Sequence, residues 1–107
     1  MSIYGLTVDL SGQVALVTGA SQGLGRSMAI ALAASGAQVI CVARNEAKLQ
    51  ETQDAIVAAG GLAEIRPCDV SQRESVDALI DSVVEKYGKL SILVNNAGIT
   101  RDTLLPS

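Results

Sequence analysis

The sequence predicts an α/β fold in which parallel strands alternate with helices. Short apolar runs alternate along the chain with longer segments whose apolar residues recur at helical spacing. The apolar residues are chiefly Ala, Val, Ile and Leu, and two tyrosines are the only aromatic residues. This composition is typical of strands that are buried on both faces of a sheet. A glycine-rich turn joins the first predicted strand directly to the first predicted helix. Together these observations indicate a β-α-β-α-β-α-β order with helices on both faces of a parallel sheet.

The first two strands and the helix between them are bounded by clear signals. The apolar run over residues 13–18 predicts the first strand. Residues 24–35 predict a helix that ends at Gly36, a residue suited to a helix C-terminus. Residues 37–43 are rich in β-branched side chains and predict the second strand.

The second helix and the third strand follow the same alternation. Residues 46–59 predict a helix, because Leu49 and Ile56 fall on one stripe and Gly60 closes the segment. Residues 62–68 then predict the third strand, with a proline near its end, where a missing N–H is tolerated.

The third helix has the clearest local start signal. Ser71 and Glu74 form an apparent capping box, in which the hydroxyl and the carboxylate satisfy each other's free backbone donors. Leu79 and other apolar residues recur at helical spacing up to Gly88, which ends the helix. Residues 90–95 predict the fourth strand.

These elements predict part of a doubly wound, Rossmann-type sheet with strand order 3-2-1-4. A nucleotide is expected at the carboxyl ends of the strands, near the switch between the first and fourth strands. We expect residues 1–107 to form one incomplete dinucleotide-binding domain. It is divided into an arm (1–12), a βα core (13–98) and a truncated loop (99–107).

Composition excludes several functional classes. The formal net charge of −3 disfavours a nucleic-acid surface, and no apolar stretch approaches the roughly 18 residues of a membrane span. The N-terminus has no basic segment typical of a secretory signal, so we expect a cytoplasmic protein. Cys41 and Cys68 are expected to be buried, reduced thiols. With no histidine and no C-x-x-C, no metal site is predicted.

The glycine turn predicts a phosphate site. Gly19, Gly23 and Gly25 are spaced G-x-x-x-G-x-G, between a strand and a helix. Free N–H groups and the helix dipole attract an anion there, and glycine lets the backbone approach it closely. No lysine follows as a Walker loop requires, and the commoner G-x-G-x-x-G pattern is absent.

Residues 18–25 resemble the T-G-x-x-x-G-x-G fingerprint of the short-chain dehydrogenase/reductase family. Asp69-Val70 after the third strand and Asn-Asn-Ala-Gly at 95–98 match the family in order. Residues 99–105 continue much as in its 3-oxoacyl-[acyl-carrier-protein] reductase branch. The resemblance covers residues 12–105.

The resemblance and the turn chemistry together imply a set of dinucleotide contacts. The N–H groups of the turn are expected to face the pyrophosphate. Asp69 and Val70 are expected to border the adenine, and residues 96–98 the adenine-side ribose. Two structural alternatives remain open: Asn95-Asn96 as a turn pair tied to the neighbouring strand, and Asp69 as a helix cap, although Ser71 is expected to fill that role. Thr18 is expected to be a structural hydroxyl. The predicted cofactor-binding residues are Gly19, Ser21, Gln22, Gly23, Leu24, Gly25, Arg44, Asp69, Val70, Asn96, Ala97 and Gly98.

The end of the second strand favours NADP(H) over NAD(H). An NAD site places a carboxylate there to bind the ribose 2′-hydroxyl, but this chain has Ala43 followed by Arg44. A guanidinium can bind a 2′-phosphate with paired hydrogen bonds. Gln22 stands where many NADP-type relatives carry a second basic residue.

No catalytic residue is predicted within the chain. The family's catalytic Ser and Tyr-x-x-x-Lys lie beyond the 95–98 segment. Here Tyr4 is followed four residues later by Val8, and Tyr87 by Ser91. We therefore expect the chain alone to be inactive, lacking the acid that protonates a carbonyl oxygen.

The resemblance implies the cofactor-binding half of an NADPH-dependent reductase of 3-oxoacyl thioesters, acting in fatty acid biosynthesis. Its ketone substrate is then carried on acyl-carrier protein, and the longer parent protein is a homo-oligomer. The alternatives are a catalytically silent dinucleotide-binding or assembly module, and a reductase of another ketone or alcohol. The fourth strand is expected at the sheet's edge, where unpaired N–H and C=O groups favour self-association of the isolated chain.

Overall fold

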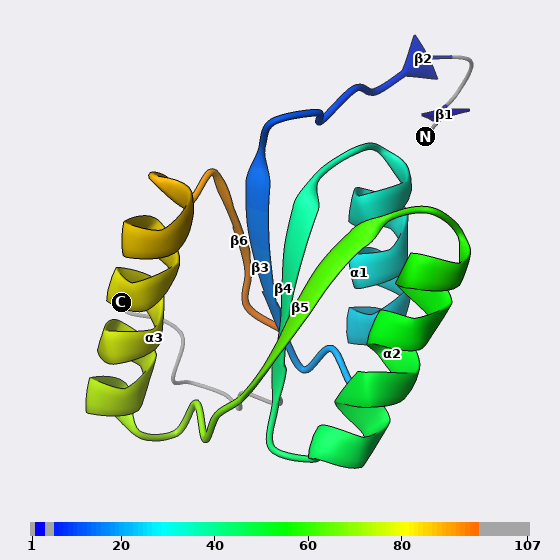
Figure 1. Cartoon of the computed structure of the whole chain (residues 1–107). Helices are drawn as coiled ribbons and strands as arrows, with labels where there is room; N and C mark the ends of the chain where they lie inside the picture. The colour runs from blue at the N-terminus through cyan, green and yellow to red at the C-terminus, as the bar shows by residue number, and fades with distance from the viewer. Residues whose placement is uncertain (1, 4–5, 97–107) are drawn as a thin grey trace.

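A four-stranded parallel sheet forms the centre of the molecule (Figure 1). The computed structural model describes residues 2–3 and 6–96. The strands lie in the order β5-β4-β3-β6, which confirms the predicted order 3-2-1-4. Their bounds are β3 (Val14–Thr18), β4 (Gln38–Ala43), β5 (Leu62–Pro67) and β6 (Ile92–Val94).

Helices cover both faces of this sheet. Helices α1 (Gly23–Ala34) and α2 (Glu46–Ala58) pack side by side on one face, and α3 (Arg73–Tyr87) lies alone on the other (Figure 1). Crossovers of this kind place every strand's carboxyl end at the same edge of the sheet. The candidate site is therefore expected at the edge where β3, β4 and β5 end.

The alternation of side chains along the strands divides the core into two layers. Ala15 and Val17 of β3, with Val39 and Cys41 of β4, face α1 and α2. The intervening residues, among them Leu16, face α3. Both central strands are therefore buried on two faces, which explains their uniformly apolar sequences.

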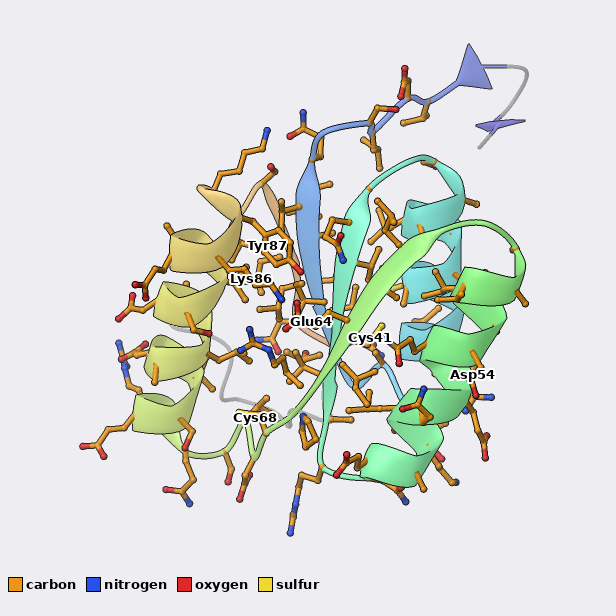
Figure 2. The ribbon with its side chains drawn as sticks, viewed as in Figure 1. Cys41, Asp54, Glu64, Cys68, Lys86 and Tyr87 are labelled. Carbon is orange, nitrogen blue, oxygen red and sulfur yellow. The ribbon has the colours of Figure 1, made fainter. Side chains whose placement is uncertain are left out.

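The two cysteines have different environments. Cys41 is fully buried, and burial raises the pKa of its thiol to about 11, so it stays protonated at neutral pH. Cys68 lies just beyond β5 and is only partly buried (Figure 2). The prediction that both thiols are buried is therefore wrong for Cys68, which follows the last residue of β5 and packs only partly against the core on the α3 face.

The start of α3 differs from the predicted capping box. Asp69 Oδ1 accepts hydrogen bonds from the Ser71 backbone N–H at 3.0 Å and the Ser71 hydroxyl at 2.6 Å. The N-cap is Gln72, which makes no side-chain capping bond. The serine hydroxyl thus donates to the preceding carboxylate and does not cap the helix. At the other end, Gly88 ends α3 as predicted, in the left-handed conformation with φ 83°.

The N-terminal segment and β6 complete the described chain. β1 (Ser2–Ile3) and β2 (Leu6–Thr7) pair antiparallel in a separate two-stranded sheet, where the sequence predicted only an arm. Among the residues that the structure describes, β6 pairs only with β3 and lies at the edge of the four-stranded sheet, as predicted. Its Leu93 is 55% exposed. None of the helices within residues 2–3 and 6–96 is long and apolar enough to cross a membrane.

A charged cluster joins the outer strand β5 to α3. Glu64 accepts hydrogen bonds from Arg66, from Lys86 at 2.9 Å and from the hydroxyl of Tyr87 (Figure 2). Burial opposes ionisation of Glu64, but the bonds from Tyr87, Lys86 and Arg66 outweigh it and lower its pKa to about 2. The ionised carboxylate therefore stabilises the packing of α3 on the sheet.

We expect Glu64→Gln to lower the free energy of unfolding at pH 7 by about 1–3 kcal/mol, because it removes the charged acceptor shared by three donors. The depressed pKa means that this stabilisation is complete above the ordinary pKa of 4.5 and is lost as the pH falls toward 2. Urea unfolding at several pH values measures the difference. The exposed substitution Glu85→Gln serves as the control. A difference between wild type and Glu64→Gln that stays constant from pH 7 to pH 2 would contradict this assignment.

Candidate functional site

A cavity of about 460 Å³ opens at the carboxyl ends of β3, β4 and β5. Three segments line it: the turn between β3 and α1, the start of α2, and the segment between β5 and α3. The lining residues are Gly19, Ser21, Gln22, Ala43, Arg44, Asn45, Lys48, Cys68, Asp69, Val70 and Ser71. A smaller cavity of about 100 Å³ lies beside β6 and shares Val70 with the first. The hollowed edge thus continues from β5 toward the switch between β3 and β6.

The glycine turn has a backbone that other residues adopt only with strain. Gly19 and Gly23 have φ of 66° and 58°, in the left-handed region. Gly25 is required for a different reason: a Cβ at that position would lie 1.9 Å from the carbonyl oxygen of Gly19 and 2.9 Å from Asn96 Nδ2. The first turn of α1 can pack this closely against the end of β3 only without a side chain at Gly25.

The start of α1 is electrostatically open to an anion. Its N-cap, Gln22, supplies no side-chain capping bond, and the first turn contains no acidic residue. The first N–H groups of a helix have no partner within it, and the helix dipole makes this end positive. Leu24, in the first turn, is 66% exposed.

Two side chains that the sequence analysis did not identify fix the carbonyl groups of the turn. The buried hydroxyl of Thr52, on α2, donates to the carbonyl oxygen of Ala20 at 2.8 Å. Arg26 donates to the carbonyl oxygen of Ser21 at 2.6 Å and to Thr52 Oγ1 at 3.0 Å. These hydrogen bonds restrict the conformation of the turn. The burial of Thr52 could have been predicted from the sequence, because Thr52 falls on the same helical stripe as Leu49 and Ile56.

The end of β6 is tied to β3 through Thr18. The Thr18 hydroxyl lies 3.1 Å from the side-chain oxygen of Asn95 and accepts a hydrogen bond from the Asn96 N–H at 2.7 Å. The structural interpretation of Thr18 is confirmed, and so is the tie between Asn95 and the neighbouring strand. Ala97 and Gly98, predicted to border the ribose, lie outside the described residues.

Two basic side chains, Arg44 and Lys48, also line the cavity. Arg44 follows the end of β4 and is exposed. Lys48, in the first turn of α2, donates from Nζ to the side-chain oxygen of Gln22 at 2.8 Å. The sequence analysis missed Lys48, although its position three residues after the N-cap Asn45 places it at the same edge of the sheet as the turn.

Asp69 is the one acidic residue among those lining the cavity. The hydroxyl and then the N–H of Ser71 hold its pKa below the ordinary value, and the charge of Arg44 adds a smaller effect. Asp69 therefore stays ionised, with one of its oxygens already hydrogen-bonded. Its predicted alternative role as a simple cap of α3 is not observed, because Gln72 occupies the N-cap.

The structure brings together part of the predicted site. Six of the predicted residues line the 460 Å³ cavity: Gly19, Ser21, Gln22, Arg44, Asp69 and Val70. Gly23, Leu24 and Gly25 form the first residues of α1 beside it. Asn96 lies at the end of β6, where its side chain approaches Gly25.

The chain matches known proteins over most of its length. The profile of the short chain dehydrogenase family matches residues 13–106. The chain is 47% identical over 100 residues to a 3-oxoacyl-[acyl-carrier-protein] reductase of Synechocystis sp., covering 90% of this chain and 39% of that protein. It is 48% identical over 87 residues to a 3beta-hydroxysteroid dehydrogenase of Mediterraneibacter gnavus, covering 81% and 32%.

A solved structure supports the same match. A metagenomic short-chain oxidoreductase in complex with NADP superposes with a TM-score of 0.82 at 47% identity, covering 84% of this chain and 41% of that one. The chain thus spans about two fifths or less of the length of these relatives.

We expect Gly25→Ala to lower the free energy of unfolding by about 3 kcal/mol, because the added methyl would overlap the Gly19 carbonyl and force the turn apart. Gly60→Ala is the matched control. Gly60 has a positive φ, unlike the helical Gly25, but nothing lies within 4 Å of its added Cβ, so only the backbone cost of about 1 kcal/mol is expected. Chemical denaturation measures both, and equal costs would show that the close approach at Gly25 relaxes freely.

Proposed function

Because the chain belongs to the short-chain dehydrogenase/reductase family, we propose that it binds NADP(H) and forms the cofactor-binding part of a ketone reductase. The observation that supports the proposal is the lining of the 460 Å³ cavity at the carboxyl ends of β3, β4 and β5. It joins a glycine turn to two basic side chains and has no carboxylate at the end of β4. The pyrophosphate, the adenosine and the 2′-phosphate of the cofactor can each be assigned a position along the carboxyl edge of the sheet.

The pyrophosphate is proposed to lie at the glycine turn. The N–H groups of Ser21, Gln22, Gly23 and Leu24 would donate to its oxygens, and the positive end of the α1 dipole would add to the attraction. Two observations support this fit. Gln22 leaves the helix start without a side-chain cap, and the first turn has no acidic residue to repel an anion.

The adenosine is proposed to lie across the ends of β4 and β5. The adenine would rest beside Asp69 and Val70, and the ribose near Asn96, Ala97 and Gly98. Val70 lines both cavities along this edge, so it supplies an apolar contact for the base between them. The Asp69 oxygens can accept hydrogen bonds from an exocyclic amine.

The 2′-phosphate is proposed to bind Arg44. In the described part of the chain Arg44 forms no ion pair with a carboxylate. It is therefore available for the paired hydrogen bonds that a guanidinium makes to a phosphate. Ala43 presents no charge that would repel the phosphate or accept a bond from a 2′-hydroxyl, so NADP(H) is preferred over NAD(H).

The proposed reaction is hydride transfer between the bound nicotinamide and the carbonyl carbon of a ketone, with 3-oxoacyl thioesters as the first candidates. The names of the relatives indicate different substrates: 3-oxoacyl-[acyl-carrier-protein] in one case and a 3beta-hydroxysteroid in another. The residues of this chain bind and orient the cofactor. No Tyr-x-x-x-Lys pair occurs in the 107 residues. The competing proposal is therefore that this segment, taken alone, binds a dinucleotide without catalysing a reaction.

Nicotinamide fluorescence separates these functions. We expect NADPH to bind the protein that carries this chain, and an acetoacetyl thioester to cause its oxidation. Binding without oxidation of NADPH by this thioester or other ketones supports the binding module. If NADPH does not bind at all, both proposals are wrong.

We expect Arg44→Ala to weaken NADPH binding by about 1–3 kcal/mol, because a charged hydrogen-bond donor to the 2′-phosphate is lost. NADH binding should change little. Titration calorimetry with both cofactors measures the effect, and the exposed substitution Arg73→Ala on α3 is the control. Equal losses for NADPH and NADH would refute a role for Arg44 at the 2′-phosphate.

A further inference from the structure

We propose that Lys48 is a second specificity-determining cation for the 2′-phosphate. It would act from the first turn of α2, in place of a basic residue in the glycine turn. The proposal rests on the proposed function, since it assumes an NADP(H) site in this cavity. It concerns a residue that neither the glycine motif nor the end of β4 identifies.

Lys48 is placed toward the cavity by the start of its helix. Its backbone N–H donates to the Asn45 side chain at 3.0 Å, which fixes Lys48 in the first turn of α2. The next residue, Leu49, is fully buried in the core beneath α1 and α2, which sets the rotation of the helix. From this position the lysine side chain reaches the glycine turn, and Lys48 and Arg44 line the same cavity.

The positive charge of Lys48 is not neutralised by an acidic partner. Its Nζ donates to Gln22, a neutral amide. Across the described ranges, 2–3 and 6–96, Lys48 forms no ion pair with a carboxylate. Glu51, three residues further along the same helix, pairs with Arg26 at 3.2 Å.

A phosphate would bind Lys48 more strongly than Gln22 does. Hydrogen bonds between an ammonium and a phosphate carry full charge on both partners, whereas the amide oxygen carries only a dipole. The lysine side chain is exposed and flexible, so exchanging Gln22 for a phosphate needs no rearrangement of the fold. A basic residue at position 22 would repel Lys48, so the neutral Gln22 is compatible with a cation supplied from α2.

The electrostatics of the cavity favour an anion between Arg44 and Lys48. Asp69 is the single acidic group among the lining residues, and its Oδ1 is occupied by Ser71. Two cations, Arg44 and Lys48, against one hydrogen-bonded carboxylate give the lining of the cavity a net positive charge. A doubly charged phosphate ester fits such a site better than a neutral hydroxyl does.

The test compares two small ligands that differ in the 2′-phosphate. Titration calorimetry gives the affinities of 2′,5′-ADP and 5′-AMP for wild type, Lys48→Gln and Lys48→Arg. The control is Lys89→Gln, which removes the same charge from an exposed lysine beyond the C-terminal end of α3. Thermal melting verifies that each variant is folded.

We expect Lys48→Gln to lower the affinity for 2′,5′-ADP about tenfold relative to 5′-AMP. Lys48→Arg should retain most of this preference, and Lys89→Gln should leave it unchanged. If Lys48 only supports Gln22 and the glycine turn, both ligands lose affinity equally, and the inference is wrong. A wild-type protein that binds 2′,5′-ADP no better than 5′-AMP would overturn the NADP(H) preference itself, and this inference with it.

Discussion

The candidate site depends on one close approach of backbone to backbone, between Gly19 at the end of β3 and Gly25 in the first turn of α1. A Cβ on Gly25 would lie 1.9 Å from the Gly19 carbonyl oxygen, so no other residue fits without moving the chain. This contact fixes the position of the first turn of α1 relative to the end of β3. The positive end of the helix dipole then lies at the carboxyl edge, where the strands place the rest of the cavity. The Asn96 side chain approaches the same point from the segment after β6, so three segments converge there.

Helix α2 contributes more to this edge than packing. Thr52 holds the carbonyl of Ala20, and Arg26 joins Thr52 to the carbonyl of Ser21. Lys48 extends the same helix's contacts to Gln22. A turn restricted in this way would lose little conformational entropy on binding the proposed ligand. The buried stripe of α2 and the glycine turn therefore form one structural unit.

The opposite face of the sheet is stabilised by different means. There α3 is the only described helix that covers the sheet, and its contact with the outer strand includes the ionised Glu64 with three donors around it. The two faces thus combine an apolar layer of small residues under α1 and α2 with a mixed layer under α3. β6 remains a free edge within the described residues, paired on one side only and with Leu93 exposed. This is the position where an unpaired strand can bind a further strand.

The sequence by itself determined the order of the three helices and the four parallel strands, the sheet order 3-2-1-4, the glycine turn and the position of Arg44 after the second strand of that sheet, but not the pairing of β1 with β2. These features follow from local patterns: periodicity, glycine spacing, and the residue at which an apolar run ends. The predicted capping box at Ser71 was wrong although it is also local, because two carboxylates, those of Glu74 and Asp69, could accept the Ser71 backbone N–H, and it donates to Asp69. Only the tertiary structure decided the contacts of Lys48 with Gln22, of Thr52 with Ala20 and of Glu64 with Tyr87. The partners in these pairs lie 26, 32 and 23 residues apart. Such pairs meet only after the helices have packed at a particular rotation on the sheet, and that rotation depends on how the buried side chains fit together.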